Sequence, residues 1–103
     1  MKIKRIIMAM AVGAATIGAQ AQNDLKLIVG TYTNGSSKGI YTFSFDQATG
    51  KWAPIDTLAI ANPSYVTVTA DGKTIYAVSE NSDETASVNA IDFDSTTGRM
   101  RLL

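Results

Sequence analysis

Short apolar runs alternate with turns rich in glycine, asparagine and aspartate over residues 25–103. Within a run, apolar and polar residues often alternate one by one, as in residues 40–45, IYTFSF, where Tyr41, Phe43 and Phe45 share a face. This alternation between turns is typical of β-strands, so the pattern predicts an all-β fold without helices in this part of the chain. The expected strands are residues 25–33, 40–45, 51–60, 64–70, 74–80, 87–93 and 99–103.

One stretch of sequence occurs twice. Residues 39–55, GIYTFSFDQATGKWAPI, return 48 residues later as residues 87–103, SVNAIDFDSTTGRMRLL. A repeat of this length that is built from strands is typical of a β-propeller blade. A seven-stranded sandwich of the immunoglobulin type would fit the number of strands equally well. The propeller is favoured because the strands of a sandwich have no reason to recur with their turns in register.

Overlaying the two copies defines the blades. Residues 64–70, 74–80 and 87–93, with a strand from residue 99, make one four-stranded blade. The blade before it begins at the equivalent of the second strand and lacks its first. Many propellers close their ring with a strand borrowed from the far end of the chain, which removes the free sheet edge. We therefore expect the ring to continue beyond Leu103, with the missing strand supplied from there.

Turn chemistry adds three local predictions. Asp46 and Asp94 begin matching D-x-x-T-G turns, so they are interpreted as turn caps rather than catalytic carboxylates. Asp71 and Gly72 predict a tight hairpin turn. Pro54 cannot donate to a strand ladder, so its strand should lie at a sheet edge or contain a bulge.

Residues 1–21 predict a secretory signal peptide. Lys2, Lys4 and Arg5 precede an uncharged, mostly apolar stretch, and Ala19-Gln20-Ala21 has the A-x-A form of a cleavage site. A transmembrane anchor is the alternative, but the apolar stretch of about 13 residues falls short of the roughly 20 that a bilayer span needs. Residues 22–103 would then be the mature chain, periplasmic or secreted and no longer attached to the membrane.

Composition excludes several classes of function. The mature chain would hold six basic and nine acidic residues, a net charge of −3, which argues against a nucleic-acid partner. The chain has no histidine and no cysteine. A Ser-His-Asp triad and metal sites built on imidazole or thiolate are therefore impossible within it. We expect no cofactor and no metal.

Three segments together resemble a known family. They are LIVGTYTNGSSKGIYTFSFDQATGKW, NPSYVTVTADGKTIYAVSEN and SVNAIDFDSTTGRMRLL, and they are similar to the start of bacterial propeller lactonases, 6-phosphogluconolactonase-like enzymes with seven blades. The resemblance implies about the first two of seven four-stranded antiparallel blades, blade 1 without its first strand and blade 2 truncated in its last. The rest of the propeller would then be the structural partner.

The resemblance also implies an activity. Family members hydrolyse a sugar-acid lactone such as 6-phosphogluconolactone, need no metal, and use His, Arg and Glu side chains from later blades. No catalytic residue is therefore assigned to this stretch. The alternative is a non-enzymatic propeller that binds a protein or glycan partner. A third reading is a complete small β-protein that oligomerises through its bare blade face.

Antiparallel strands predict which loops share one side of the ring. The longer, polar connections gather on one side, and the short hairpins lie on the other. The predicted substrate-binding residues on the polar side are Asn62, Ser64, Tyr65 and Glu80. Each has a structural alternative: Asn62 can form a turn, Ser64 can bond a strand-end amide, and Glu80 can be a solvated carboxylate. Tyr41, Phe43, Phe45 and Trp52 are expected to pack between blades rather than against a sugar.

Overall fold

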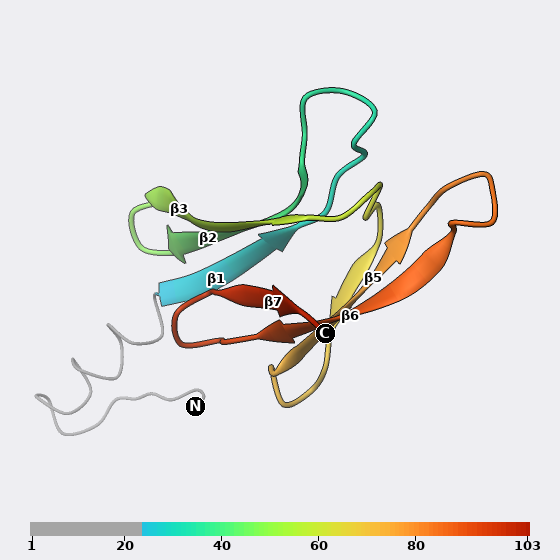
Figure 1. Ribbon diagram of the computed structural model, residues 1–103. Helices are drawn as coiled ribbons and strands as arrows, with labels where there is room; N and C mark the ends of the chain where they lie inside the picture. The colour runs from blue at the N-terminus through green and yellow to red at the C-terminus, as the bar shows by residue number, and fades with distance from the viewer. Residues whose placement is uncertain (1–23) are drawn as a thin grey trace, which may run out of the picture.

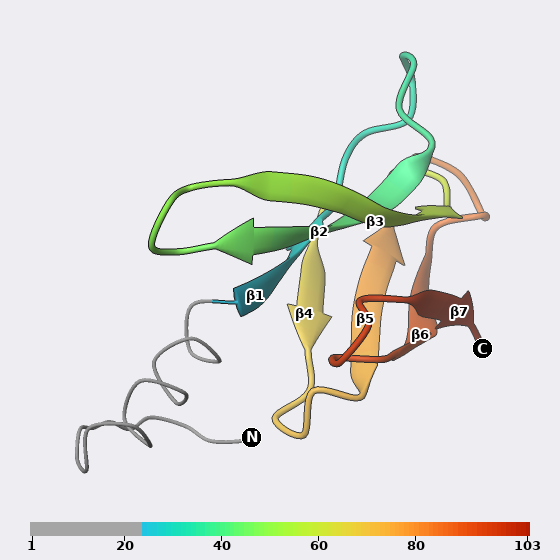
Figure 2. The same cartoon turned by 90° about the vertical axis from the view of Figure 1, so that its left-hand side faces the viewer.

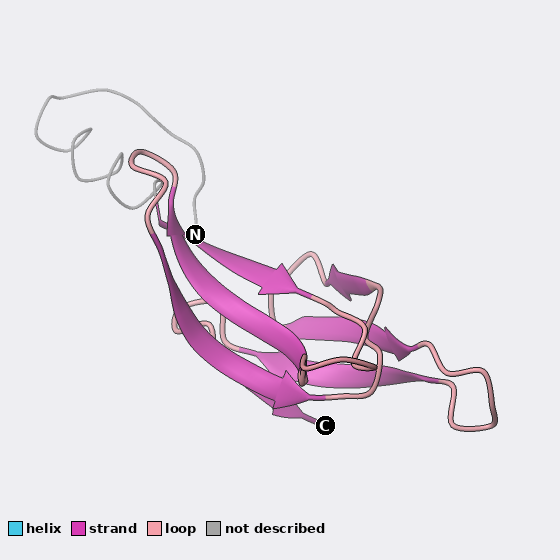
Figure 3. Ribbon diagram, turned by 90° about the horizontal axis from the view of Figure 1, so that it is seen from above, coloured by secondary structure: helices cyan, strands magenta, loops and turns pink. Residues whose placement is uncertain are grey.

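The computed structural model describes residues 24–103, and every regular element in that range is a β-strand (Figure 3). The strands are β1 (Asp24–Val29), β2 (Gly39–Asp46), β3 (Trp52–Ala59), β4 (Val66–Val68), β5 (Thr74–Ser79), β6 (Ser87–Phe93) and β7 (Met100–Leu102). No helix in the described range is long and apolar enough to span a lipid bilayer. The all-β prediction is confirmed, whereas the predicted signal peptide lies outside the described residues.

Two antiparallel sheets divide the strands in chain order. One sheet has the order β1-β2-β3 and the other β4-β5-β6-β7, and they lie beside each other (Figures 1 and 2). Every neighbour within a sheet is also the neighbour in sequence. An immunoglobulin-type sandwich would instead exchange strands between its sheets through Greek-key connections. The observed order is that of consecutive propeller blades.

The strand around Pro54 behaves as predicted. β3 lies at the edge of its sheet, where the absent proline N–H interrupts no inner ladder. Thr42 pairs with Asp56 and Phe43 with Pro54, so Ile55 is an extra residue on β3 and the register shifts there. This is a β-bulge, and it turns Asp56 and Ile55 toward the second sheet.

β1 is shorter than the sequence pattern predicted, because its last residues make other contacts. β1 ends at Val29 rather than at residue 33. Beyond it, the Thr31 hydroxyl donates to the Gly39 carbonyl at 2.6 Å. The chain at Gly30 passes so near Pro63 that a Cβ there would lie 2.2 Å from the Pro63 oxygen. Thr31, Tyr32 and Thr33 therefore belong to a loop that packs against the second sheet.

The connection from β4 to β5 is also wider than predicted. β4 covers only Val66–Val68, and the Asp71-Gly72 pair lies in a loop closed by the bond from Thr69 N to Thr74 O at 2.9 Å. The Asp71 carboxylate accepts from the Thr69 hydroxyl at 2.6 Å and from Lys73 N at 3.0 Å. The Asp71 side chain thus bonds a backbone N–H of its own loop, and the connection is this wider loop rather than the predicted tight two-residue hairpin.

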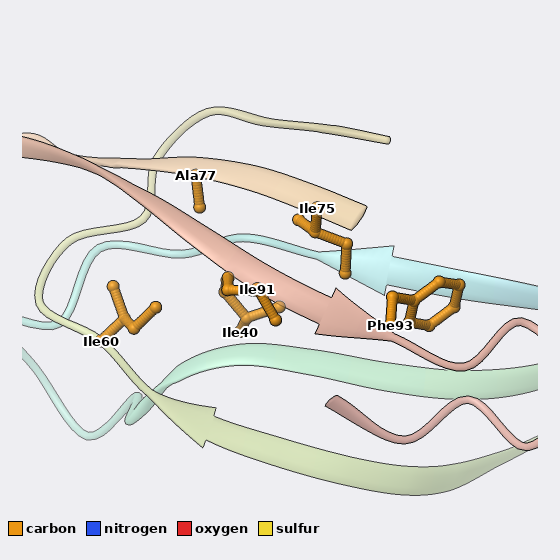
Figure 4. Close-up of a cluster of buried hydrophobic side chains, with 6 residues drawn as sticks. All are labelled: Ile40, Ile60, Ile75, Ala77, Ile91 and Phe93. Atoms are coloured by element: carbon orange, nitrogen blue, oxygen red, sulfur yellow. The ribbon is translucent and has the colours of Figure 1, made fainter. Parts of the chain in front are cut away.

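The hydrophobic core lies between the two sheets. Its buried members, drawn in Figure 4, are Ile40, Ile60, Ile75, Ala77, Ile91 and Phe93. The residues packed around them are Ile28, Leu58, Val66 and Met100. Each sheet thus buries one face against the other, as neighbouring blades do.

Two polar contacts cross this core. Thr42 is fully buried, and its hydroxyl donates to the Gly98 carbonyl at 2.7 Å. At the edge, Met100 N donates to the Asp56 carboxylate at 2.9 Å. Both contacts satisfy groups that would be costly to leave unpaired away from water. They fix how the turn before β7 sits on the first sheet.

The aromatic residues of β2 and β3 lie on the outer face of the first sheet. Phe43 and Trp52 meet edge to face with ring centroids 5.6 Å apart, and Tyr41 stacks on Phe43 at 6.4 Å. The side chains turned toward the second sheet are instead those of Ile40 and Thr42. The four aromatic side chains expected between blades are therefore absent from the core that joins the two described sheets, where Phe93 packs with aliphatic residues.

Candidate functional site

The connections fall at two ends of the sheets (Figure 1). The D-x-x-T-G turns after β2 and β6 lie at one end. At the other end, three polar segments meet: residues 30–38, 61–65 and 80–86. We call these three segments the polar rim. The contacts among them decide whether the predicted binding residues form a site.

The D-x-x-T-G turns are structural. The Asp46 carboxylate accepts from Ala48 N at 2.9 Å, and the Asp94 carboxylate accepts from Thr96 N at 2.9 Å. In both turns the aspartate carbonyl also accepts from the glycine four residues later, at 2.7 Å. The hydrogen bond from Thr96 N, with that from Thr97 N, lowers the pKa of Asp94. Turn capping, as predicted, accounts for both carboxylates.

Asn62 joins the three rim segments. Its backbone has a φ of 47°, a left-handed conformation that asparagine tolerates better than most residues. The side-chain Oδ1 accepts from Thr33 N at 2.7 Å, and Nδ2 donates to Asn81 Oδ1 at 2.9 Å. The Asn62 carbonyl accepts from Ser64 N at 2.8 Å and from Glu80 N at 3.0 Å. Asn62 is therefore occupied in holding the rim together, as its turn-forming alternative implied.

Glu80 is an exposed carboxylate held in one orientation. Its Oε1 accepts from the Tyr32 hydroxyl at 2.9 Å and from the hydroxyl of Ser64. The hydrogen bond from Ser64, followed by that from Tyr32, lowers the pKa of Glu80. Glu80 is therefore ionised at neutral pH, when it can accept hydrogen bonds but cannot act as a general acid.

Tyr65 stands apart from this network. Its carbonyl accepts from Val78 N at 3.1 Å, which fixes the backbone at the start of the second sheet. The residue is 69% exposed. Of the four predicted binding residues, the structure thus brings Asn62, Ser64 and Glu80 into one hydrogen-bonded group. Tyr65 follows this group in the chain and presents its ring to solvent.

Tyr32 is the contributor that the sequence pattern missed. It was expected inside a strand covering residues 25–33, whereas it lies on the rim and bonds Glu80. The available signal was Gly30, since a glycine that ends a strand often marks a close approach of two backbones. Here that approach is to Pro63, and it brings Tyr32 across to the second sheet.

The described residues hold no obvious metal site. Within residues 24–103, no three His, Cys, Asp or Glu side chains gather closely enough to bind a metal ion. Two surface hollows, of about 190 and 370 Å³, lie near the hairpin end and include no rim residue. The smaller is lined in part by Asp24, Phe45 and Trp52.

Comparison with known proteins decides the family. Residues 26–103 match the family model described as "Lactonase, 7-bladed beta-propeller". The chain belongs to the seven-bladed propeller lactonases. The resemblance and the propeller fold predicted from the sequence are confirmed. These matches to lactonases do not favour the non-enzymatic alternative.

The relatives share the described part of the chain. The 6-phosphogluconolactonase of Bacillus subtilis (strain 168) is 36% identical over 78 aligned positions, which cover 73% of this chain and 22% of the relative. A Bacteroides uniformis crystal structure assigned as a 6-phosphogluconolactonase superposes with a TM-score of 0.78 at 52% identity, covering 80% of this chain and 24% of that one. The Pseudomonas aeruginosa periplasmic gluconolactonase gives 0.72 at 36% identity, covering 78% and 24%. The chain thus spans about a quarter of each relative's length.

Proposed function

We propose that residues 22–103 form the N-terminal part of a hydrolase that opens a sugar-acid lactone of the 6-phosphogluconolactone type. The observation that carries the proposal is the family match over residues 26–103. The 52% identity to the Bacteroides uniformis protein supports it. In this proposal the β1-β2-β3 sheet is blade 1 without its first strand, and the β4-β5-β6-β7 sheet is blade 2 with a shortened last strand.

Within this protein, the polar rim would contribute to binding rather than to bond breaking. The Glu80 carboxylate would accept hydrogen bonds from lactone hydroxyls, Ser64 would hold that carboxylate, and the exposed ring of Tyr65 would cover an apolar sugar face. Asn62 would position the three loops. In the reaction, water adds to the lactone carbonyl and the ring C–O bond breaks, leaving a carboxylate and a hydroxyl group. Groups from other blades would polarise that carbonyl and activate the water.

We further propose export to the periplasm or the medium. The charged start, apolar stretch and A-x-A sequence of residues 1–21 support this, as does the relative named as a periplasmic gluconolactonase. The full-length protein, expressed in a Gram-negative host, should appear in the periplasmic or secreted fraction. Mass spectrometry should find a mature chain that begins at Gln22. An intact N-terminus in the cytoplasmic fraction would contradict export.

Activity is tested with the full-length protein and a panel of aldonolactones, by measuring acid release above spontaneous hydrolysis. Hydrolysis of at least one sugar lactone is expected. Tyr65→Ala removes a binding contact, and Ser64→Ala frees the Glu80 carboxylate that makes another, so both should raise KM several-fold with little change in kcat. Failure of the folded protein to hydrolyse any member of the panel would refute the lactonase proposal.

A further inference from the structure

Carboxylates outnumber cations on the polar rim. Its acidic residues are Glu80, Asp83 and Glu84, and Lys38 is the one lysine or arginine in its three segments. A site that binds a phosphate group usually supplies arginine, lysine or a cluster of backbone N–H groups. The part of the site that these loops would form therefore has the wrong sign for a phosphorylated ligand.

Glu80 is the carboxylate best placed to act on a ligand. The Asp83 carboxylate accepts from Thr85 N at 2.9 Å and from the hydroxyl of the same residue, so it caps its own loop. Glu80 instead bonds across the rim, to Tyr32 and to Ser64. Both of these bonds reach Oε1, which leaves Oε2 able to accept hydrogen bonds from a ligand.

The position of Glu80 adds to this argument. It follows β5 directly, and Ser64, which holds it, lies two residues before β4. β4 begins the four-stranded sheet, and the first strand of a propeller blade borders the central channel around which the blades are arranged. Glu80 is thus anchored on the side of its blade that lies closest to the channel.

We infer that Glu80 selects an uncharged, hydroxyl-bearing sugar lactone over its phosphorylated counterpart, an inference that rests on the function proposed above. A held carboxylate accepts charge-assisted hydrogen bonds from sugar hydroxyls. The same carboxylate repels a phosphate ester, which carries a charge of about −1.5 to −2 at neutral pH. The hydrogen bonds that lower the pKa of Glu80 keep this repulsion in place throughout the neutral range.

The test compares kcat/KM of the full-length protein for glucono-1,5-lactone and for its 6-phosphate. The unmodified protein should prefer the neutral lactone. Glu80→Gln keeps the shape of the side chain and removes its charge. The variant should therefore show a lower kcat/KM for the neutral lactone and a higher kcat/KM for the phosphorylated one. Together these changes should reduce the preference roughly tenfold. Glu84→Gln makes the same chemical change on the same loop and should alter the preference by less than about twofold.

A second measurement needs no variant. Added salt screens the repulsion between Glu80 and a phosphate, so kcat/KM for the phosphorylated lactone should rise with ionic strength while that for the neutral lactone stays level. A preference for the phosphorylated lactone in the unmodified protein would overturn the inference. So would equal effects of Glu80→Gln and Glu84→Gln, or a salt response shared by both lactones. Hydrolysis of neither of these two lactones would also overturn the inference, whereas hydrolysis of no lactone in the whole panel would refute the proposed function itself.

Discussion

Two glycines at equivalent places in the repeat allow the energetic cost of crowding the contact between the sheets to be measured. Gly50 and Gly98 each close a D-x-x-T-G turn with a positive φ, of 76° and 84°. A Cβ at Gly50 would have no atom within 4 Å. A Cβ at Gly98 would lie 2.5 Å from Ile55 Cδ1 of the first sheet. Replacing each glycine with alanine therefore makes the same backbone change with and without a collision between sheets.

The magnitudes follow from these contacts. Placing alanine in a left-handed conformation costs about 1–2 kcal/mol, which both variants should lose. Overpacking costs about 1–3 kcal/mol more, and only Gly98→Ala incurs it. The lower end applies here, because Ile55 is half-buried and its Cδ1 is the end of a flexible side chain that can move aside. Gly50→Ala should therefore destabilise the protein by about 1–2 kcal/mol, and Gly98→Ala by about 2–3 kcal/mol.

The assay is urea denaturation of the full-length variants, with the free energy of unfolding taken by linear extrapolation. Ile55→Val removes Cδ1, the atom nearest the added Cβ, so it should recover part of the loss in the Gly98→Ala background. On its own it should cost about 0.5–1.5 kcal/mol. Equal costs for the two glycine variants, or strictly additive effects of Gly98→Ala and Ile55→Val, would refute the reasoning.

Three further predictions rest on single contacts. Thr42→Val should lower the free energy of unfolding by about 1–3 kcal/mol, because it leaves the buried Gly98 carbonyl without its donor, and Thr42→Ser should retain most of that stability in the same urea titration. Gly30→Ala should cost about 1–3 kcal/mol, because its Cβ would collide with the Pro63 carbonyl oxygen, and an unchanged free energy of unfolding would contradict the close approach. The folded-state pKa of Asp94 lies below its ordinary value of 3.8. The ionised carboxylate therefore adds its full share to the free energy of unfolding above that pH, and this share is lost as the pH falls toward the lowered pKa. Asp94→Asn should flatten the pH dependence of the free energy of unfolding below about pH 4.

Local chemistry made much of the fold predictable. The duplicated sequence indicated two successive sheets because a repeated run of strands and turns has to form the same local structure twice. The turn roles of Asp46 and Asp94 followed from the D-x-x-T-G pattern. The edge position and bulge of the strand containing Pro54 followed from its missing N–H. These features depend on residues close together in the chain.

Features set by distant residues were harder to predict. The high β-propensity of Thr31, Tyr32 and Thr33 outweighed the signal of Gly30, so the sequence pattern did not indicate that Tyr32 would leave the ladder and bond Glu80. Alternation in residues 40–45 divided the two faces correctly, but it could not indicate which face meets the second sheet. Antiparallel connectivity did place Ser64 and Glu80 on the same rim.

The many bonds of Asn62 affect how any mutational survey of this protein should be interpreted. An alanine scan would score Asn62 among the most sensitive polar positions, because its loss would disconnect three loops at once. That sensitivity would reproduce the signature expected of a residue in contact with a ligand, although the amide group is already engaged by Thr33 and Asn81. Thermal melting of the variant separates the two origins, since a lost ligand contact would leave the melting temperature of the unliganded protein unchanged.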